Sequence, residues 1–136
     1  MIEDAYIVFL DETWEQETCR IPNIPRYITH SAYQSHVGRR GQGTVVCIYR
    51  CYLEGKIDIC KVDQHKWYIW IRLKHSTPMY IAECYIPHKE SPFYARYRVD
   101  PQEPFEDLSM DVCTYLQQRH VMVLGDLNAR VEHKQF

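Results

Sequence analysis

The chain has 136 residues, of which 46% are hydrophobic and 13% aromatic, so it can bury a core and is no disordered segment. This length fits one domain or part of a larger one. The formal net charge of −2 excludes a uniformly basic surface, so a nucleic-acid partner would need a local basic stripe. No apolar run is long enough to span a membrane, and the N-terminus has no signal pattern. We therefore expect an intracellular protein, nuclear or cytoplasmic.

Six cysteines stand at positions 19, 47, 51, 60, 84 and 113, and several lie inside apolar runs. No C-x-x-C pair occurs, and the spacings match no closed zinc site. We prefer buried free thiols in a reducing compartment to a disulfide framework. The prediction is six free thiols.

The first two thirds of the chain are predicted to be strands. Residues 6–10 (Y-I-V-F-L) are wholly apolar, which predicts a central strand covered on both faces. A strand is predicted at 44–49 and, more weakly, at 26–33, with a basic glycine-rich turn between them at 38–43. Short polar links then predict an antiparallel meander of three strands: 57–62, 67–73 and 80–86.

The last third is predicted to contain a loop, one helix and a final strand. Pro92 and Pro101 predict a loop over residues 88–101. Residues 104–118 carry apolar side chains at helical spacing behind an opening proline, which predicts a helix. The apolar run 121–124 (V-M-V-L) predicts a second central strand, buried on both faces.

Polar residues follow the two apolar strands directly. Asp11 and Glu12 follow the first strand, and Asp126 and Asn128 follow the last one after Gly125. Residues two apart on an extended chain point the same way, so Asp126 and Asn128 can face one site. An aspartate and an asparagine aimed at one point suit a hard divalent cation and a phosphate oxygen. A simple Asp/Asn turn after a strand is the alternative interpretation.

Three segments together give the chain a family resemblance. F-L-D-E-T-W, C-Y-I-P-H and V-M-V-L-G-D-L-N-A-R occur in this order. In order and spacing they resemble the endonuclease/exonuclease/phosphatase superfamily, which includes deoxyribonuclease-like and abasic-site endonucleases. The similarity is greatest to the endonuclease domains of non-LTR retrotransposons. The resemblance implies an α/β fold, a two-sheet sandwich with outer helices.

The resemblance also implies roles for individual residues. Glu12 would be the ligand of Mg²⁺ or Mn²⁺, and Tyr85 would lie against the scissile phosphate. Asp126 would help to activate the attacking water, and Asn128 would bind the phosphate. The implied partner is DNA, contacted through its phosphate backbone. His88 and Arg130 are further candidates for phosphate contacts, although a solvated loop side chain is the simpler interpretation of both.

The chain also departs from the family pattern. Members begin with another strand and helix, and they continue to a strand that ends in Ser-Asp-His, where the histidine is a principal catalytic residue. Neither segment occurs here. We therefore expect a partial domain over residues 1–136, truncated at both ends, with one sheet and little of the other. Such a chain would be inactive or impaired alone. His120, at the start of the last strand, lies at the wrong end to substitute, and His133 lies in a polar tail.

Two other interpretations stay open. One is another phosphoesterase of the same superfamily, acting on inositol phosphates, sphingomyelin or RNA tails. The other is no enzyme at all, but a decayed fragment of a mobile element or a module that binds metal or nucleic acid without turnover.

The site assignment has spatial consequences. Glu12, Asp126 and Asn128 should converge, with their strands as neighbours in one sheet. The single predicted helix can cover only one face of that sheet. The other face would stay exposed, which predicts self-association through it.

Overall fold

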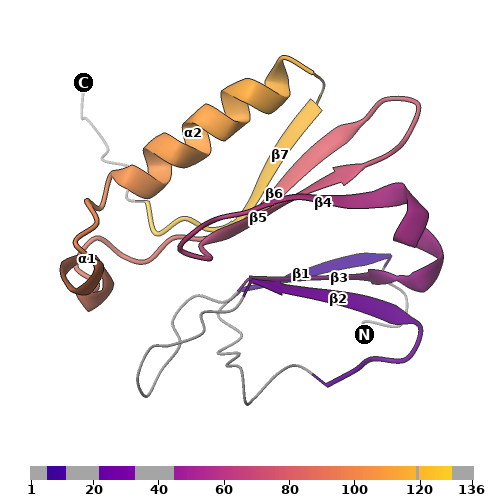
Figure 1. Ribbon diagram of the computed structural model, residues 1–136, viewed down its shortest axis with the longest axis horizontal. Helices are drawn as coiled ribbons and strands as arrows, with labels where there is room; N and C mark the ends of the chain where they lie inside the picture. Colours follow the sequence, from indigo (N-terminus) through magenta and orange to yellow (C-terminus); the bar gives the residue numbers. More distant parts are fainter. Residues whose placement is uncertain (1–5, 12–21, 33–44, 119, 130–136) are drawn as a thin grey trace, which may run out of the picture.

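Two sheets pack face to face, and one long helix covers the outer face of the larger sheet (Figure 1). The structure is a computed structural model, and it describes residues 6–11, 22–32, 45–118 and 120–129. Its layers are therefore α2, a four-stranded sheet and a three-stranded sheet. This is a mixed α/β fold compatible with the predicted sandwich.

The three-stranded sheet is antiparallel, with the order β1-β3-β2. Its strands are β1 (Ile7–Leu10), β2 (Tyr27–Ala32) and β3 (Val45–Arg50). Alternate residues of β3 point in opposite directions. Val45, Cys47 and Tyr49 belong to the core between the two sheets, while Val46 and Ile48 are buried on the other side. β3 is thus the central strand of this sheet.

The predicted meander is confirmed in the four-stranded sheet, which has the order β4-β5-β6-β7. Its strands are β4 (Ile57–Val62), β5 (Tyr68–Leu73), β6 (Met79–Tyr85) and β7 (His120–Asp126). A 3₁₀ helix, η2 (Cys51–Lys56), connects β3 to β4 and so joins the two sheets. Ile69, Ile71 and Ile81 face β3 across the sandwich.

The predicted helix is confirmed as α2 (Glu103–Leu116), and it returns the chain so that β7 pairs with β6 in parallel. Its residues Phe105, Leu108, Val112 and Tyr115 pack against Trp70 and the other outer-face residues of the sheet. Polar contacts add to this packing, because the Asp111 carboxylate accepts hydrogen bonds from Trp70 Nε1 at 3.2 Å and Lys61 Nζ at 2.7 Å. A crossover of this kind is what a parallel pair requires.

The prediction of a loop over residues 88–101 is wrong in part, because Pro92–Tyr97 form a helix, α1. Pro92 occupies the first turn, where a helix does not need the missing N–H. Ser91 caps the helix, since its Oγ accepts a hydrogen bond from the Phe93 N–H at 3.3 Å. Phe93 and Tyr94 are buried against Trp67, so α1 closes one end of the sandwich.

The prediction that residues 6–10 and 121–124 form central strands is also wrong. β1 and β7 are edge strands of different sheets in the described part of the chain. Val121 and Val123 pack toward α2, whereas Met122 and Leu124 on the opposite face are 43% and 37% exposed. A wholly apolar sequence indicates that other elements pack on both faces of the strand. It does not indicate whether the strand pairs with a neighbouring strand along one edge or along both.

The expectation of one sheet with an open face is corrected as well. The three-stranded sheet covers the inner face of β5 and β6 with Val45, Cys47 and Tyr49. Exposed apolar residues on this face lie on the two edge strands of the sheet, Val62 on β4 and Met122 and Leu124 on β7. Self-association stays a prediction, now restricted to these edge strands.

Two further expectations concern the thiols and the helices. The cysteines in the described ranges are free thiols, as predicted, and Cys19 lies outside those ranges. No helix in the described ranges combines the length and the apolar character that crossing a membrane requires.

The β6–β7 pairing can be tested at Gly125. This residue has φ = 107°, and a Cβ there would lie 2.0 Å from the Cys84 carbonyl oxygen. We expect Gly125→Ala to lower the free energy of unfolding by at least about 2 kcal/mol, because the strain and the clash add. Gly55→Ala is the matched control, since nothing lies within 4 Å of its Cβ position. Equal urea midpoints for the two variants would contradict this packing.

Candidate active site at the carboxyl ends of β1, β6 and β7

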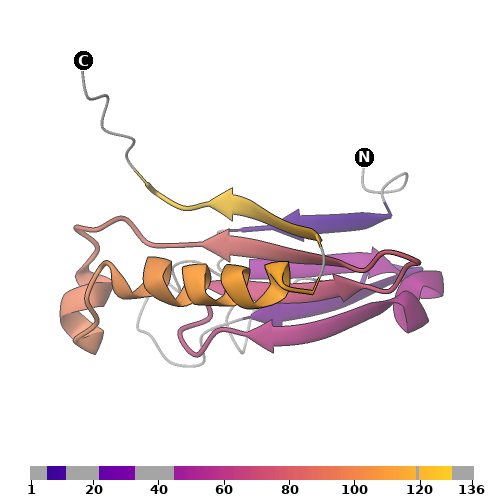
Figure 2. The same cartoon turned by 90° about the horizontal axis from the view of Figure 1, so that it is seen from above.

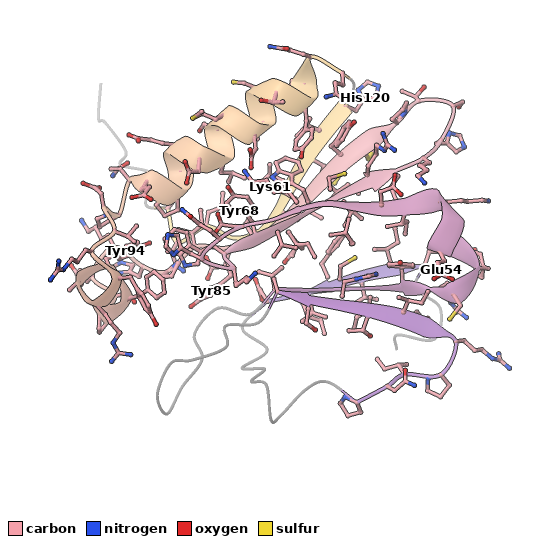
Figure 3. The ribbon with its side chains drawn as sticks, in the orientation of Figure 1. Glu54, Lys61, Tyr68, Tyr85, Tyr94 and His120 are labelled. Carbon is pink, nitrogen blue, oxygen red and sulfur yellow. The ribbon has the colours of Figure 1, made fainter. Side chains whose placement is uncertain are left out.

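Three strands from both sheets run in the same direction and end at the same end of the sandwich. Figure 2 shows β1, β6 and β7 with their arrowheads toward the α1 end. β1 is followed by Asp11, β6 carries Glu83 and Tyr85, and β7 ends at Asp126. In Figure 3, Tyr85 lies at this end between the sheets, whereas His120 lies at the opposite end, as the sequence predicts.

Asp126 and Asn128 are held against β6 by a set of hydrogen bonds. Tyr85 and Asp126 are register partners in the parallel pair, and the Ile86 N–H donates to the Asp126 carbonyl at 2.9 Å. Asn128 Nδ2 donates to the Ile86 carbonyl at 2.8 Å. The Asn128 N–H donates to Asp126 Oδ1 at 2.8 Å, so both side chains have defined positions.

This arrangement is a turn of the Asp/Asn type, and it is also anchored to the next strand. Asn128 adopts a left-handed backbone with φ = 46°, which asparagine tolerates better than most residues. One amide hydrogen of Asn128 is used within the fold, while its Oδ1 has no such bond in the described part of the chain. Asp126 is exposed to solvent. The turn therefore presents oxygen acceptors next to Tyr85.

A cavity of about 240 Å³ lies beside Tyr85. Its walls include Pro87, His88, Ser91 and Pro92. Two hydrogen bonds fix the segment between β6 and α1 that forms these walls. Tyr94 Oη donates to the Pro87 carbonyl at 2.7 Å, and the Ser91 N–H donates to the His88 carbonyl at 2.8 Å. The predicted residues Tyr85 and His88 thus share one cavity.

Histidine 88 has a defined hydrogen-bonding arrangement. Its Nδ1 accepts a hydrogen bond from the Glu90 N–H at 3.3 Å. In a neutral imidazole the other nitrogen then carries the hydrogen, so Nε2 can donate. In this form Nε2 of His88 is a hydrogen-bond donor that suits an anionic oxygen.

Glutamate 83 is a residue of this end that the sequence analysis did not select. It is 4% exposed and lies two residues before Tyr85, on the face that packs against the three-stranded sheet. Burial, and to a smaller extent the nearby charge of Asp11, raises the pKa of its carboxyl group to about 7. One signal could have identified it: a charged residue between Ala82 and Cys84 in an otherwise apolar strand.

The other predicted residues lie outside the described ranges. These are Glu12 and Arg130, as well as His133 and the basic turn of residues 38–43. The expectation that the strands leading to Glu12 and Asp126 are neighbours in one sheet is wrong, because β1 and β7 belong to facing sheets. β1 and β7 still end at the same end of the sandwich (Figure 2), so Asp11, which follows β1, and Asp126, which ends β7, come to this end from two different sheets.

The family resemblance implies a divalent metal ion, so we ask whether the oxygen donors at this end of the sandwich fit one. No three His, Cys, Asp or Glu side chains in the described ranges are grouped to hold a metal. The carboxylates of Asp11 and Glu83 interact electrostatically, however, and Glu83 is a buried carboxylate without a described hydrogen bond. Oxygen donors of this kind fit Mg²⁺ or Mn²⁺, which need only one or two carboxylates plus water and substrate oxygens.

No protein-family model matches this chain, and no curated protein matches it in sequence.

The buried carboxyl group of Glu83 predicts a pH dependence of stability. Its pKa is about 7 in the fold against an ordinary 4.5, so the folded chain holds a proton that the unfolded chain has released between these values. The stabilisation of the folded state by this bound proton is complete below pH 4.5 and is lost as the pH rises through 7. We expect Glu83→Gln to be more stable than the wild type by on the order of 3 kcal/mol at pH 8, and by much less at pH 5.

Urea unfolding of both proteins at several pH values between 5 and 8 measures this difference. Glu106→Gln is the control, because Glu106 is an exposed residue of α2 and its substitution should give a nearly constant difference. A difference between Glu83→Gln and the wild type that stays the same at every pH would rule out a buried titrating carboxyl group at position 83.

Proposed function

We propose that the chain belongs to a metal-dependent phosphodiesterase of the endonuclease/exonuclease/phosphatase type, with DNA as its substrate. One observation carries the proposal: Asp126 and Asn128 form a hydrogen-bonded turn that is anchored to Ile86, and Tyr85, the register partner of Asp126, lines a cavity. These are the residues to which the sequence resemblance assigns the phosphate and the attacking water. Their mutual arrangement is what such a site requires.

In the proposed mechanism the phosphate is held from several sides. Tyr85 donates its hydroxyl hydrogen to a nonbridging oxygen, and His88 donates from Nε2 on the cavity side. Asn128 orients the phosphate from the turn, and the Asp126 carboxylate accepts a hydrogen bond from the attacking water and aligns it. Glu12 and the neighbouring carboxylates would hold Mg²⁺ or Mn²⁺, which supplies neutralisation of the charge that develops on the phosphate.

A local basic segment beside the site supports a polyanionic substrate. Lys89, Arg96 and Arg98 are exposed in and around α1, with Glu90 as the acidic residue among them. This segment gives the local positive charge that the overall net charge of −2 lacks. A DNA backbone that crosses α1 would bring one phosphate to the cavity at Tyr85.

The binding half of the proposal is tested with a fluorescein-labelled duplex in Mg²⁺ at several salt concentrations. We expect Lys89→Ala/Arg96→Ala to weaken binding and to reduce the slope of log Kd against log salt by up to about 2. Lys56→Ala/Lys74→Ala removes the same charge around η2 and the end of β5, away from the site. Equal losses for the two pairs, or no binding by the wild type, would count against a DNA site at α1.

The catalytic half is tested by plasmid nicking with Mg²⁺. The sequence contains no Ser-Asp-His segment, and the hydrogen bond that Nδ1 of His88 accepts leaves Nε2 as a hydrogen-bond donor and not as a base. We therefore expect no measurable nicking by this chain, with Asp126→Ala as the control. Nicking that Asp126→Ala abolishes would show instead that these residues suffice for turnover, and His88→Gln would then test whether His88 supplies the missing function.

A further inference from the structure

The starting point is the unusual position of Glu83. The side chain is 4% exposed, between Ile69 of β5 and Leu124 of β7, its register partners on the two adjoining strands. No hydrogen bond or ion pair of its carboxylate is found among the described residues, and no lysine or arginine is among the groups that act on it electrostatically. Burying a carboxylate without a partner costs several kcal/mol, so such a residue is normally replaced or paired.

A second carboxylate makes the position less favourable still. Asp11 follows β1 in the facing sheet, and because Ile7 and Phe9 of β1 belong to the core between the sheets, the same alternation directs Asp11 toward this core. Its charge acts on Glu83 as a like charge. Two carboxylates that approach each other from two sheets repel, unless a proton or a cation lies between them. The two sheets therefore bring two carboxyl groups toward each other at one end of the sandwich, an arrangement that a bound cation would stabilise.

We propose that Glu83 and Asp11 bind a divalent cation between the two sheets, which makes Glu83 a metal ligand in this chain. The inference rests on the proposed function for the presence of a metal at this end, and it goes beyond it in naming the ligands. Glu83 lies on the same face as Tyr85, two residues earlier in β6. The cation would therefore lie next to the proposed phosphate, on the side toward the core between the sheets.

The chemistry of the neighbouring groups selects the kind of cation. Carboxylate oxygens favour Mg²⁺ and Mn²⁺, which complete their shells with water or phosphate oxygens. Glu83 influences two thiols electrostatically, those of Cys47 and Cys84, and only Cys47 belongs to the core between the sheets. Burial raises the pKa of Cys47 to about 12, so this thiol stays protonated and is no ligand for a soft metal.

The experiment measures Mn²⁺ binding by the loss of the free Mn²⁺ signal in electron paramagnetic resonance. The wild type, Glu83→Gln, Asp11→Asn and the control Glu106→Gln are compared at pH 8. We expect Glu83→Gln and Asp11→Asn each to raise the Kd for Mn²⁺ by at least about 10-fold, with Glu106→Gln unchanged. Thermal melting serves as the second readout, since Mg²⁺ should raise the Tm of the wild type but hardly that of Glu83→Gln.

Glu83→Gln keeps the shape of the side chain and removes a buried charge, so it should melt cooperatively in EDTA at or above the wild-type temperature. Wild-type Mn²⁺ affinity in this variant would overturn the role of Glu83 and leave the proposed function intact if DNA binding persists. A wild type that does not bind Mn²⁺ at millimolar concentration would also overturn it. Mn²⁺ binding that depends on Glu83, without any binding of DNA, would support this inference and reject the proposed substrate.

Discussion

The parallel pairing of β6 with β7 is the constraint on which the rest of this structure depends. It requires a long crossover, which α2 supplies, and α2 in turn covers the outer face of the four-stranded sheet. The same pairing brings Asp126 beside Tyr85 and lets Asn128 reach the Ile86 carbonyl. Gly125 makes this possible, because its lack of a side chain allows close approach to Cys84. Fold and candidate site therefore share one set of contacts.

The second organising feature is that the core between the two sheets is apolar over most of its length but contains a carboxyl group near the α1 end. Ile69, Ile71 and Ile81 fill the space between the sheets with apolar groups, which supply most of the stabilisation. Glu83 lies in the same strand and on the same face as Ile81, yet it carries a carboxyl group. A protein that keeps such a group in its core gives up stability locally, which is common where charge serves binding or catalysis.

The sequence was sufficient for most elements and for part of the candidate site. Strand periodicity and the helical spacing of residues 104–118 depend on local pattern, and these predictions are confirmed. The edge positions of β1 and β7 could not be predicted, because coverage of the faces and pairing of the edges are independent properties. Asp126 is the register partner of Tyr85, Asn128 is bonded to Ile86, and Tyr85 shares a cavity with His88, while the roles of these residues stay predictions. Glu83 was missed because the direction in which a strand residue points depends on the sheet that packs against it. The loop prediction for residues 88–101 treats Pro92 as a helix breaker, although its position after Ser91 suits a helix start.

The topology of the sandwich also orders the events of folding. β4, β5 and β6 are neighbours in sequence and in space, so they can pair after closing only short loops. The candidate site instead needs β1 and β7, which come from opposite ends of the sequence and pair with or face strands far away along the chain. The meander should therefore protect its amide hydrogens first in a pulse-labelling exchange experiment, and those of Ile86 and Asn128 should become protected last. A partly folded chain would already have the core of its larger sheet while it still lacked every assembled feature of the site.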